Sequence, residues 1–189
     1  MNGQVIMKIS QIYSEFERGF DNEYYAKLAS EDVMVAPVLV QIFLEDEYVN
    51  ARWAMQLLLY ISGNTPEIIY PYYSYIVKGL CSKNNFLAWN TWRILSKLTL
   101  IDVQDKFNAV KEKFYSALNS TCLSEYSIAC ECAVDIFAAK TDERDKILEI
   151  IKNSHNRIFC IEDEPIANSG SIADEKAEEF FEKIMNLDV

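Results

Sequence analysis

The chain offers few residues that could perform catalysis. It has one histidine, His155, so any histidine-based triad must use it, and no GxSxG elbow or similar motif supplies a nucleophile. His155 lies in the segment KNSHNRIF, at the expected end of a helix, where interaction with the last carbonyl groups explains it more simply. Glu131 and Asp135 share a helix face at i and i+4, a spacing typical of a solvated flank. The sequence therefore predicts no enzymatic activity and no catalytic residues.

Metal, nucleotide and disulfide sites are equally unsupported by sequence patterns. The EDE clusters at 45–47 and 162–164 lack the alternating ligands and the glycine of a calcium loop, and no glycine-rich loop is present to cradle a phosphate. The cysteines are odd in number and contain no CxxC motif, a usage typical of thiols kept reduced in the cytoplasm. They are Cys81, Cys122, Cys130, Cys132 and Cys160. We predict no cofactor, no metal site and no small-molecule substrate.

Composition and charge limit the class of protein. The 189 residues are half apolar, which suits one folded domain able to bury roughly 70 % of the surface of its unfolded chain. The net charge is −11, but residues 48–120 carry 8 basic and 4 acidic side chains between two acidic ends. This balance disfavours a surface built for nucleic acid. The N-terminus does not read as a secretory signal, and the longest apolar run, VMVAPVLVQIFL, is too short to span a bilayer, so we predict a cytoplasmic protein without membrane contact.

Hydrophobic periodicity predicts helices along almost the whole chain and no strands. Thr65 is placed to cap a helix that has Pro66 at its first position. Asp102 is placed to cap another helix, with Asp105 in the first turn. Ser171 and Asp174 form an approximate capping box before a last amphipathic helix that carries Ile172, Phe180 and Ile184 on its apolar side.

The helices repeat with a period near 40 residues. Aligning three helices places Trp53, Trp92 and Cys132 in register at spacings of 39 and 40 residues. The helices that follow them align at the same spacings, through Ile68, Phe107 and Ile147. Such a period, with two amphipathic helices in each unit, is the pattern of HEAT or armadillo arrays, because one helix pair cannot bury its apolar face without a stacked neighbour.

The segment APVLVQIFLEDEYVNARWAMQLLLYIS, residues 36–62, resembles the junction of two HEAT repeats, with an apolar second helix, an acidic turn and a first helix carrying Arg52. The resemblance covers about residues 31–154 and implies a fold rather than an activity. The whole chain also resembles a group of small bacterial HEAT-like proteins, some of which are called adenylosuccinate lyases. The glycine- and serine-rich signature loop of that much longer lyase superfamily has no counterpart in this sequence.

We therefore predict an all-α, right-handed superhelix, a HEAT-like solenoid of about three helix pairs with capping helices. The whole chain, 1–189, forms one domain in this interpretation. Residues 1–30 form an N-terminal cap, 31–159 the repeats, 160–171 a flexible link and 172–189 a C-terminal capping helix.

The tyrosine-rich segment IIYPYYSYIV, residues 68–77, lies on the second helix of a predicted pair. At 100° per residue, Ile69, Tyr73, Ile76 and Leu80 form one apolar stripe, which makes Tyr73 a core ring. Tyr72 flanks the stripe and is also expected in the core, whereas Tyr70 lies at its edge and Tyr75 points away beside Lys78. Pro71 is expected to kink or restart the helix.

Two interpretations of the outward residues remain open. In the first, they are partly exposed rings and solvated lysines on a solenoid surface. In the second, Tyr70, Tyr75, Lys106 and Lys113 form an aromatic and basic partner-binding strip along the second helices, suited to an acidic peptide. Other lysines would extend this strip. Those other lysines are Lys140, Lys146 and Lys152.

The second interpretation predicts a non-catalytic scaffold that binds a protein or peptide. The alternative is a DNA-binding protein of the alkylpurine DNA glycosylase type, because those enzymes are HEAT-like solenoids whose concave face binds DNA. Trp89, Trp92 and Arg93 in the basic middle would serve it. The strongly acidic chain and the expected burial of Trp92 make nucleic acid the less favoured partner.

Overall fold

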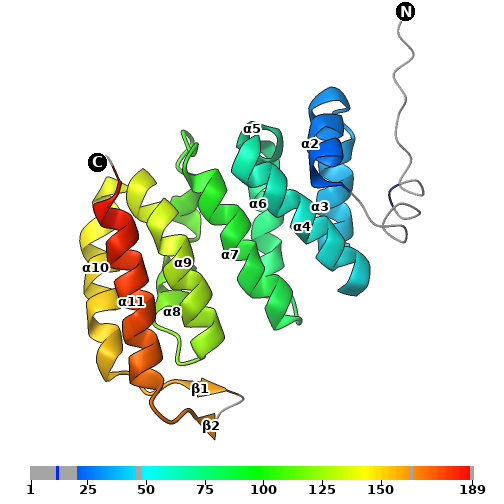
Figure 1. Cartoon of the computed structure of the whole chain (residues 1–189). Coiled ribbons are helices and arrows are strands. Elements are labelled where there is room, and N and C mark those ends of the chain that lie inside the picture. Colours follow the sequence, from blue (N-terminus) through cyan, green and yellow to red (C-terminus); the bar gives the residue numbers. More distant parts are fainter. Residues whose placement is uncertain (1–11, 13–20, 46–47, 162–163, 188–189) are drawn as a thin grey trace, which may run out of the picture. The chain divides into compact units, whose positions relative to one another are not determined.

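The computed structural model describes residues 12, 21–45, 48–161 and 164–187. These residues are almost wholly helical, with one short hairpin, so the predicted all-α class is confirmed (Figure 1). The predicted single domain divides into two compact units, Met1–Ile101 and Asp102–Val189, which we call the first and the second unit. Among the described residues, none of the helices is long and apolar enough to cross a membrane.

The first unit is built on α4, which packs against α2, α3, α5 and α7 (Figure 1). The helix α3 is almost entirely apolar. Seven of its residues are buried, because it is covered on several sides. The predicted N-terminal cap, 1–30, lies mostly outside the described residues. Its last part belongs to α2, which is capped by Asp21, whose carboxylate accepts from the Glu23 N–H at 2.9 Å. The helices are α2 (Asn22–Glu31), α3 (Val35–Glu45), α4 (Tyr48–Asn64), α5 (Pro66–Ile69), η1 (Tyr70–Tyr72), α6 (Tyr73–Ile76), η2 (Val77–Cys81) and α7 (Asn85–Thr99).

The tyrosine-rich helix is broken as expected. It alternates between short α and 3₁₀ pieces from Pro66 to Cys81, and Pro71 lies in the first 3₁₀ turn. Since proline lacks an N–H and its ring clashes with the preceding turn, a regular α-helix cannot run through this position. Thr65 does occupy the cap position, but its buried hydroxyl makes no hydrogen bond within the described part of the chain. The predicted capping bond is therefore not formed.

Close packing requires a glycine at position 79 in η2. A Cβ atom added to Gly79 would lie 2.6 Å from the Thr91 Oγ1 and 2.7 Å from the ring of Phe43. Thr91 and Phe43 are both buried, so neither side chain has room to retreat. The absence of a side chain at Gly79 thus lets η2 approach α3 and α7 closely.

We expect Gly79→Ala to lower the free energy of unfolding by about 1–3 kcal/mol, because it overpacks a filled core. The matched control is Gly63→Ala, since Gly63 lies near the end of α4 and has nothing within 4 Å of an added Cβ. That variant should be neutral or more stable by up to about 1 kcal/mol, because alanine favours a helix. Urea denaturation followed by circular dichroism measures both, and equal effects of the two variants would contradict the packing argument.

The second unit is built on α9, which packs against α8, α10 and α11 (Figure 1). Phe180 of α11 is 1 % exposed and contacts Phe137 of α9, with ring centroids 5.9 Å apart. The Cys130 thiol donates to the Lys176 carbonyl at 3.3 Å, so the C-terminal helix docks against the unit. The helices are η3 (Lys106–Ala109), α8 (Lys111–Leu118), α9 (Leu123–Ala139), η4 (Thr141–Glu143), α10 (Arg144–Lys152), η5 (Asn153–Asn156) and α11 (Ser169–Met185).

The segment 160–171, predicted to be a flexible link without strands, contains an antiparallel hairpin. Its strands are β1 (Cys160–Ile161) and β2 (Glu164–Pro165), and Ile166 N–H donates to the Phe159 carbonyl at 2.9 Å. The buried Phe159 ring packs on Tyr126, with centroids 4.9 Å apart. Two-residue strands are too short to show the alternation by which a strand is recognised in a sequence.

The structure tests two of the predicted helix starts. The Asp102 carboxylate does accept from the N–H groups of Lys106 and Phe107, both at 2.9 Å, but the residue at the N-cap position of η3 is Asp105, which was predicted in the first turn. The predicted capping box of Ser171 and Asp174 is wrong: α11 begins at Ser169, so Ser171 lies inside the helix and donates to the Asn168 carbonyl.

The repeat positions are largely buried. Trp92, Cys132, Phe107 and Ile147 are buried, and Trp53 is half-buried. Ile69, rather than Ile68, is fully buried in the first unit, so the alignment of the second helices shifts by one residue there. The pattern reflects core positions on successive helices.

Candidate functional site

Tyr75 is the most outward-facing ring of the tyrosine-rich segment, 56 % exposed on α6. The ammonium of Lys78 lies 4.9 Å from the centroid of its ring, a cation–π distance. The predicted orientation of both side chains is confirmed. Together they present a large aromatic surface and a positive charge to solvent.

The other tyrosines follow the predicted stripe in part. Tyr73 is 1 % exposed, which confirms it as a core ring, and Tyr70 is half-buried with its ring 6.1 Å from that of Tyr73. Tyr72 is only half-buried, because the 3₁₀ turn at Pro71 changes the angle per residue and rotates it toward the surface.

The two predicted lysines belong to the second unit. Lys113 is exposed on α8, and Lys106 is half-buried at the start of η3, where its N–H donates to Asp102. Tyr70 and Tyr75 belong to the first unit. The predicted strip therefore consists of an aromatic part on one unit and a basic part on the other.

Lys140, a proposed extension of the strip, is held by carboxylates instead. Its ammonium lies 2.9 Å from both the Asp102 and the Asp105 carboxylates, and the Asp102 side chain is 0 % exposed. Burial alone would lower the pKa of Lys140, but the hydrogen bonds to Asp105 and Asp102 outweigh it and raise the pKa above its ordinary value. Lys140 remains a cation that is already neutralised within the protein.

A second charged group lies beside the first. Glu143 accepts hydrogen bonds from the Tyr115 hydroxyl and, at 3.0 Å, from the Lys111 ammonium. The bond from Tyr115, followed by that from Lys111, lowers the pKa of Glu143 despite partial burial. Burial, and then the hydrogen bond to Glu143, raises the pKa of Tyr115, so this phenol keeps its proton. These bonds tie α8 to the turn between α9 and α10.

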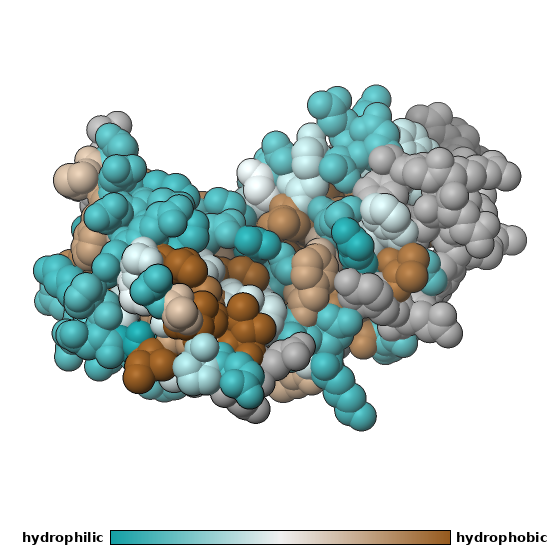
Figure 2. All heavy atoms as spheres, turned by 60° about the horizontal axis from the view of Figure 1, so that its bottom comes forward, coloured by the Kyte–Doolittle hydropathy of each residue, from teal (hydrophilic) through white to brown (hydrophobic). Residues whose placement is uncertain are grey.

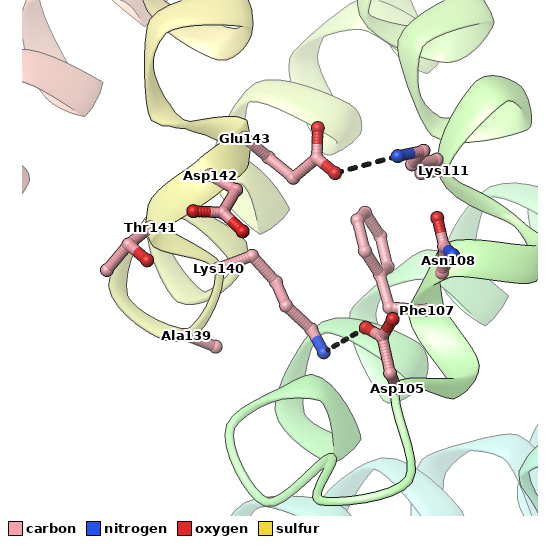
Figure 3. Close-up of a pocket in the computed structure, with 9 residues that line it drawn as sticks. All are labelled: Asp105, Phe107, Asn108, Lys111, Ala139, Lys140, Thr141, Asp142 and Glu143. Carbon is pink, nitrogen blue, oxygen red and sulfur yellow. Dashed lines mark hydrogen bonds and ion pairs between the residues drawn. The ribbon is translucent and has the colours of Figure 1, made fainter.

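Members of both groups line a hollow of about 540 Å³ between η3, α8 and the α9–α10 turn (Figure 3). Both of its lysine ammoniums point at carboxylates of the protein, as the dashed lines of Figure 3 show. An acidic peptide would thus have to displace internal partners to use them. The lining residues are Asp105, Phe107, Asn108, Lys111, Ala139, Lys140, Thr141, Asp142 and Glu143.

His155 is not paired with helix carbonyls, contrary to prediction. It lies in η5, and its Nδ1 is 2.8 and 2.9 Å from the two carboxylate oxygens of Asp174 on α11. The pair links η5 to α11. Within the described ranges, no three histidine, cysteine or acidic side chains cluster as metal ligands would.

The residues of the DNA-binding alternative are poorly placed for base stacking. Trp92 is 4 % exposed, as expected from the repeat, and Trp89 is half-buried on the same helix. The Arg93 guanidinium donates to the Asn90 side chain at 2.6 Å. A ring must be accessible to stack on a base, and Trp92 is not.

One exposed feature was not predicted. Figure 2 turns the hairpin end of the second unit forward and shows hydrophobic residues gathered there. Ile158 and Ile161 are exposed at this end. Their segment carries no helical periodicity, so the sequence pattern could not predict that these apolar side chains are exposed.

Comparison with known proteins identifies no relative. No protein-family model matches the chain, and no curated protein and no solved structure matches it. The geometry of the chain itself is the basis for a functional proposal.

Proposed function

We propose that this protein is a non-catalytic, HEAT-like scaffold that binds a partner protein or peptide through the second helices of its pairs. The stacked packing of α4 with α7 in the first unit, and of α8 with α10 and α9 with α11 in the second, supports the helix-pair architecture. The cysteine usage supports a cytoplasmic compartment.

The observation that carries the proposal is the exposed Tyr75 with Lys78 above its ring. Tyrosine is enriched among the residues that dominate binding energy at interfaces, because it offers a rigid ring and a polar end. The ring lies on a segment fixed by the buried neighbours Tyr73 and Ile76, so binding would not need to order it first. The adjacent ammonium favours a partner with a carboxylate near an apolar side chain.

The test uses immobilised wild-type protein and the variant Tyr75→Ala, Lys113→Ala with nuclease-treated extract of the native organism. A partner recovered by the wild type should be lost with the double variant. Titration of the purified partner should then show at least about tenfold weaker binding by Tyr75→Ala alone, as expected for an interface hot spot. Lys113→Ala alone should have a smaller effect that fades at high salt.

Tyr24→Ala is the matched control, because Tyr24 is 51 % exposed but lies on α2, outside the second helices. It should bind like the wild type. Equal recovery by all variants would place the site elsewhere. Binding of DNA in low salt that falls steeply with added salt would instead favour the DNA-binding alternative.

A further inference from the structure

Two cysteines lie directly opposite each other in the second unit, although 38 positions separate them in the sequence. Cys122 precedes α9, Cys160 begins β1, and the two form an isolated parallel β-bridge. Both thiols are free and both residues are half-exposed. The cysteine count and spacing gave no sign of this pair.

The backbone holds the two positions together. Cys160 N–H donates to the Thr121 carbonyl at 2.8 Å, and Arg157 donates to the carbonyls of Leu118 and Ser120 at 2.7 and 3.2 Å. The segment before β1 is therefore fastened along the segment before α9.

Residues paired across a β-bridge lie at a separation that a disulfide can span. Neighbouring strands lie about 4.7–4.9 Å apart, within the range of about 4.4–6.8 Å between the Cα atoms of disulfide-bonded cysteines. Directly opposite residues also project to the same face of a β-pair. The bridge therefore places the two residues where a disulfide can join them.

The remaining cysteines are poor competitors. Cys130 and Cys132 are buried on α9, and burial raises the pKa of the Cys130 thiol to about 12, which disfavours its reactive thiolate. Cys81 is exposed, but no second cysteine lies in the first unit, to which it belongs. Only Cys122 and Cys160 combine access with an adjacent partner.

We propose that Cys122 and Cys160 are a thiol-oxidation site that forms an intramolecular disulfide with a peroxide oxidant. One thiolate attacks a peroxide oxygen, the O–O bond breaks, and a sulfenic acid and one water result. The second thiol then attacks the sulfenic sulfur, the S–S bond forms, and a second water leaves. The two thiols lose two electrons and two protons in total, and hydrogen peroxide is reduced to two waters.

The disulfide would tie the start of α9 to the hairpin that leads into α11. Because it closes a long loop, it restricts the unfolded chain and stabilises the second unit. Oxidation thus fixes the C-terminal helix on its support without adding a ligand.

The test uses full-length Cys81→Ser protein treated with hydrogen peroxide, followed by alkylation of free thiols and peptide mapping by mass spectrometry. We expect one intramolecular disulfide joining the peptides that contain Cys122 and Cys160. The thermal midpoint should rise by about 10 °C and return to its starting value with a reducing agent. Cys81→Ser, Cys160→Ser protein should show neither change, and its circular dichroism spectrum verifies that it folds.

Two outcomes would overturn the proposal. In the first, Cys122 and Cys160 both stay alkylatable under peroxide conditions that oxidise Cys81 of the wild type. In the second, the mapped disulfide joins a different pair of cysteines.

Discussion

Asp102→Ala is expected to lower the free energy of unfolding by about 3 kcal/mol or more. The carboxylate is fully buried, accepts two backbone N–H groups at the start of η3 and receives the Lys140 ammonium. Its removal leaves two part-buried backbone N–H groups without this acceptor and a half-buried cation with one partner fewer. Urea denaturation followed by circular dichroism measures the loss.

Asp102→Asn and Asp105→Asn provide a matched pair. Both carboxylates lie 2.9 Å from the same ammonium, but Asp105 is 64 % exposed. Asparagine also tolerates the left-handed backbone of Asp105, whose φ is 54°. We expect Asp105→Asn to cost less than about 1 kcal/mol, as for an exposed ion pair, and Asp102→Asn clearly more. Equal losses would show that burial and capping do not distinguish the two groups.

Phe180→Ala should cost about 3–5 kcal/mol, the range for truncating a buried phenylalanine. The Phe180 ring meets Phe137 of α9 edge to face, and so forms the centre of the contact that docks α11. Hydrogen exchange of the α11 amides should accelerate more than that of the α9 amides, because α9 keeps its packing against α8 and α10 when α11 detaches locally.

The neighbouring Phe181→Ala is the control for this variant. Phe181 is half-buried, and its ring contacts Phe180 at 5.4 Å. It should lose less stability and leave exchange in α11 closer to that of the wild type. A loss below about 1 kcal/mol for Phe180→Ala would mean that the helix is held chiefly by other contacts, such as His155 with Asp174.

Features set by local periodicity were predictable from the sequence. Tyr73 and Tyr75 are two positions apart, and a helix must turn them to different faces, as their burial confirms. Pro71 interrupts the helix wherever the segment packs, because the missing N–H is a property of the residue. Tyr72 escaped this reasoning, since a 3₁₀ turn does not advance by 100° per residue.

Features set by distant partners were not predictable. Lys140 was grouped with other lysines by its place on a helix, yet Asp102 and Asp105, on the segment before η3, determine its role. His155 likewise meets Asp174 from another element, and Cys122 meets Cys160. One sequence records no such pairings, because they depend on how helices return to one another.

The broken helix from Pro66 to Cys81 follows a longer path than an α-helix with the same number of residues. Half of the residues from Pro66 to Cys81 lie in η1 and η2. A 3₁₀ turn rises about 2.0 Å per residue against about 1.5 Å in an α-helix, so the segment follows a path of about 28 Å. An unbroken α-helix would need about 18 or 19 residues for that reach. The 3₁₀ turns therefore lengthen the path of this segment by about 4 Å over the roughly 24 Å that the same residues would span as one α-helix.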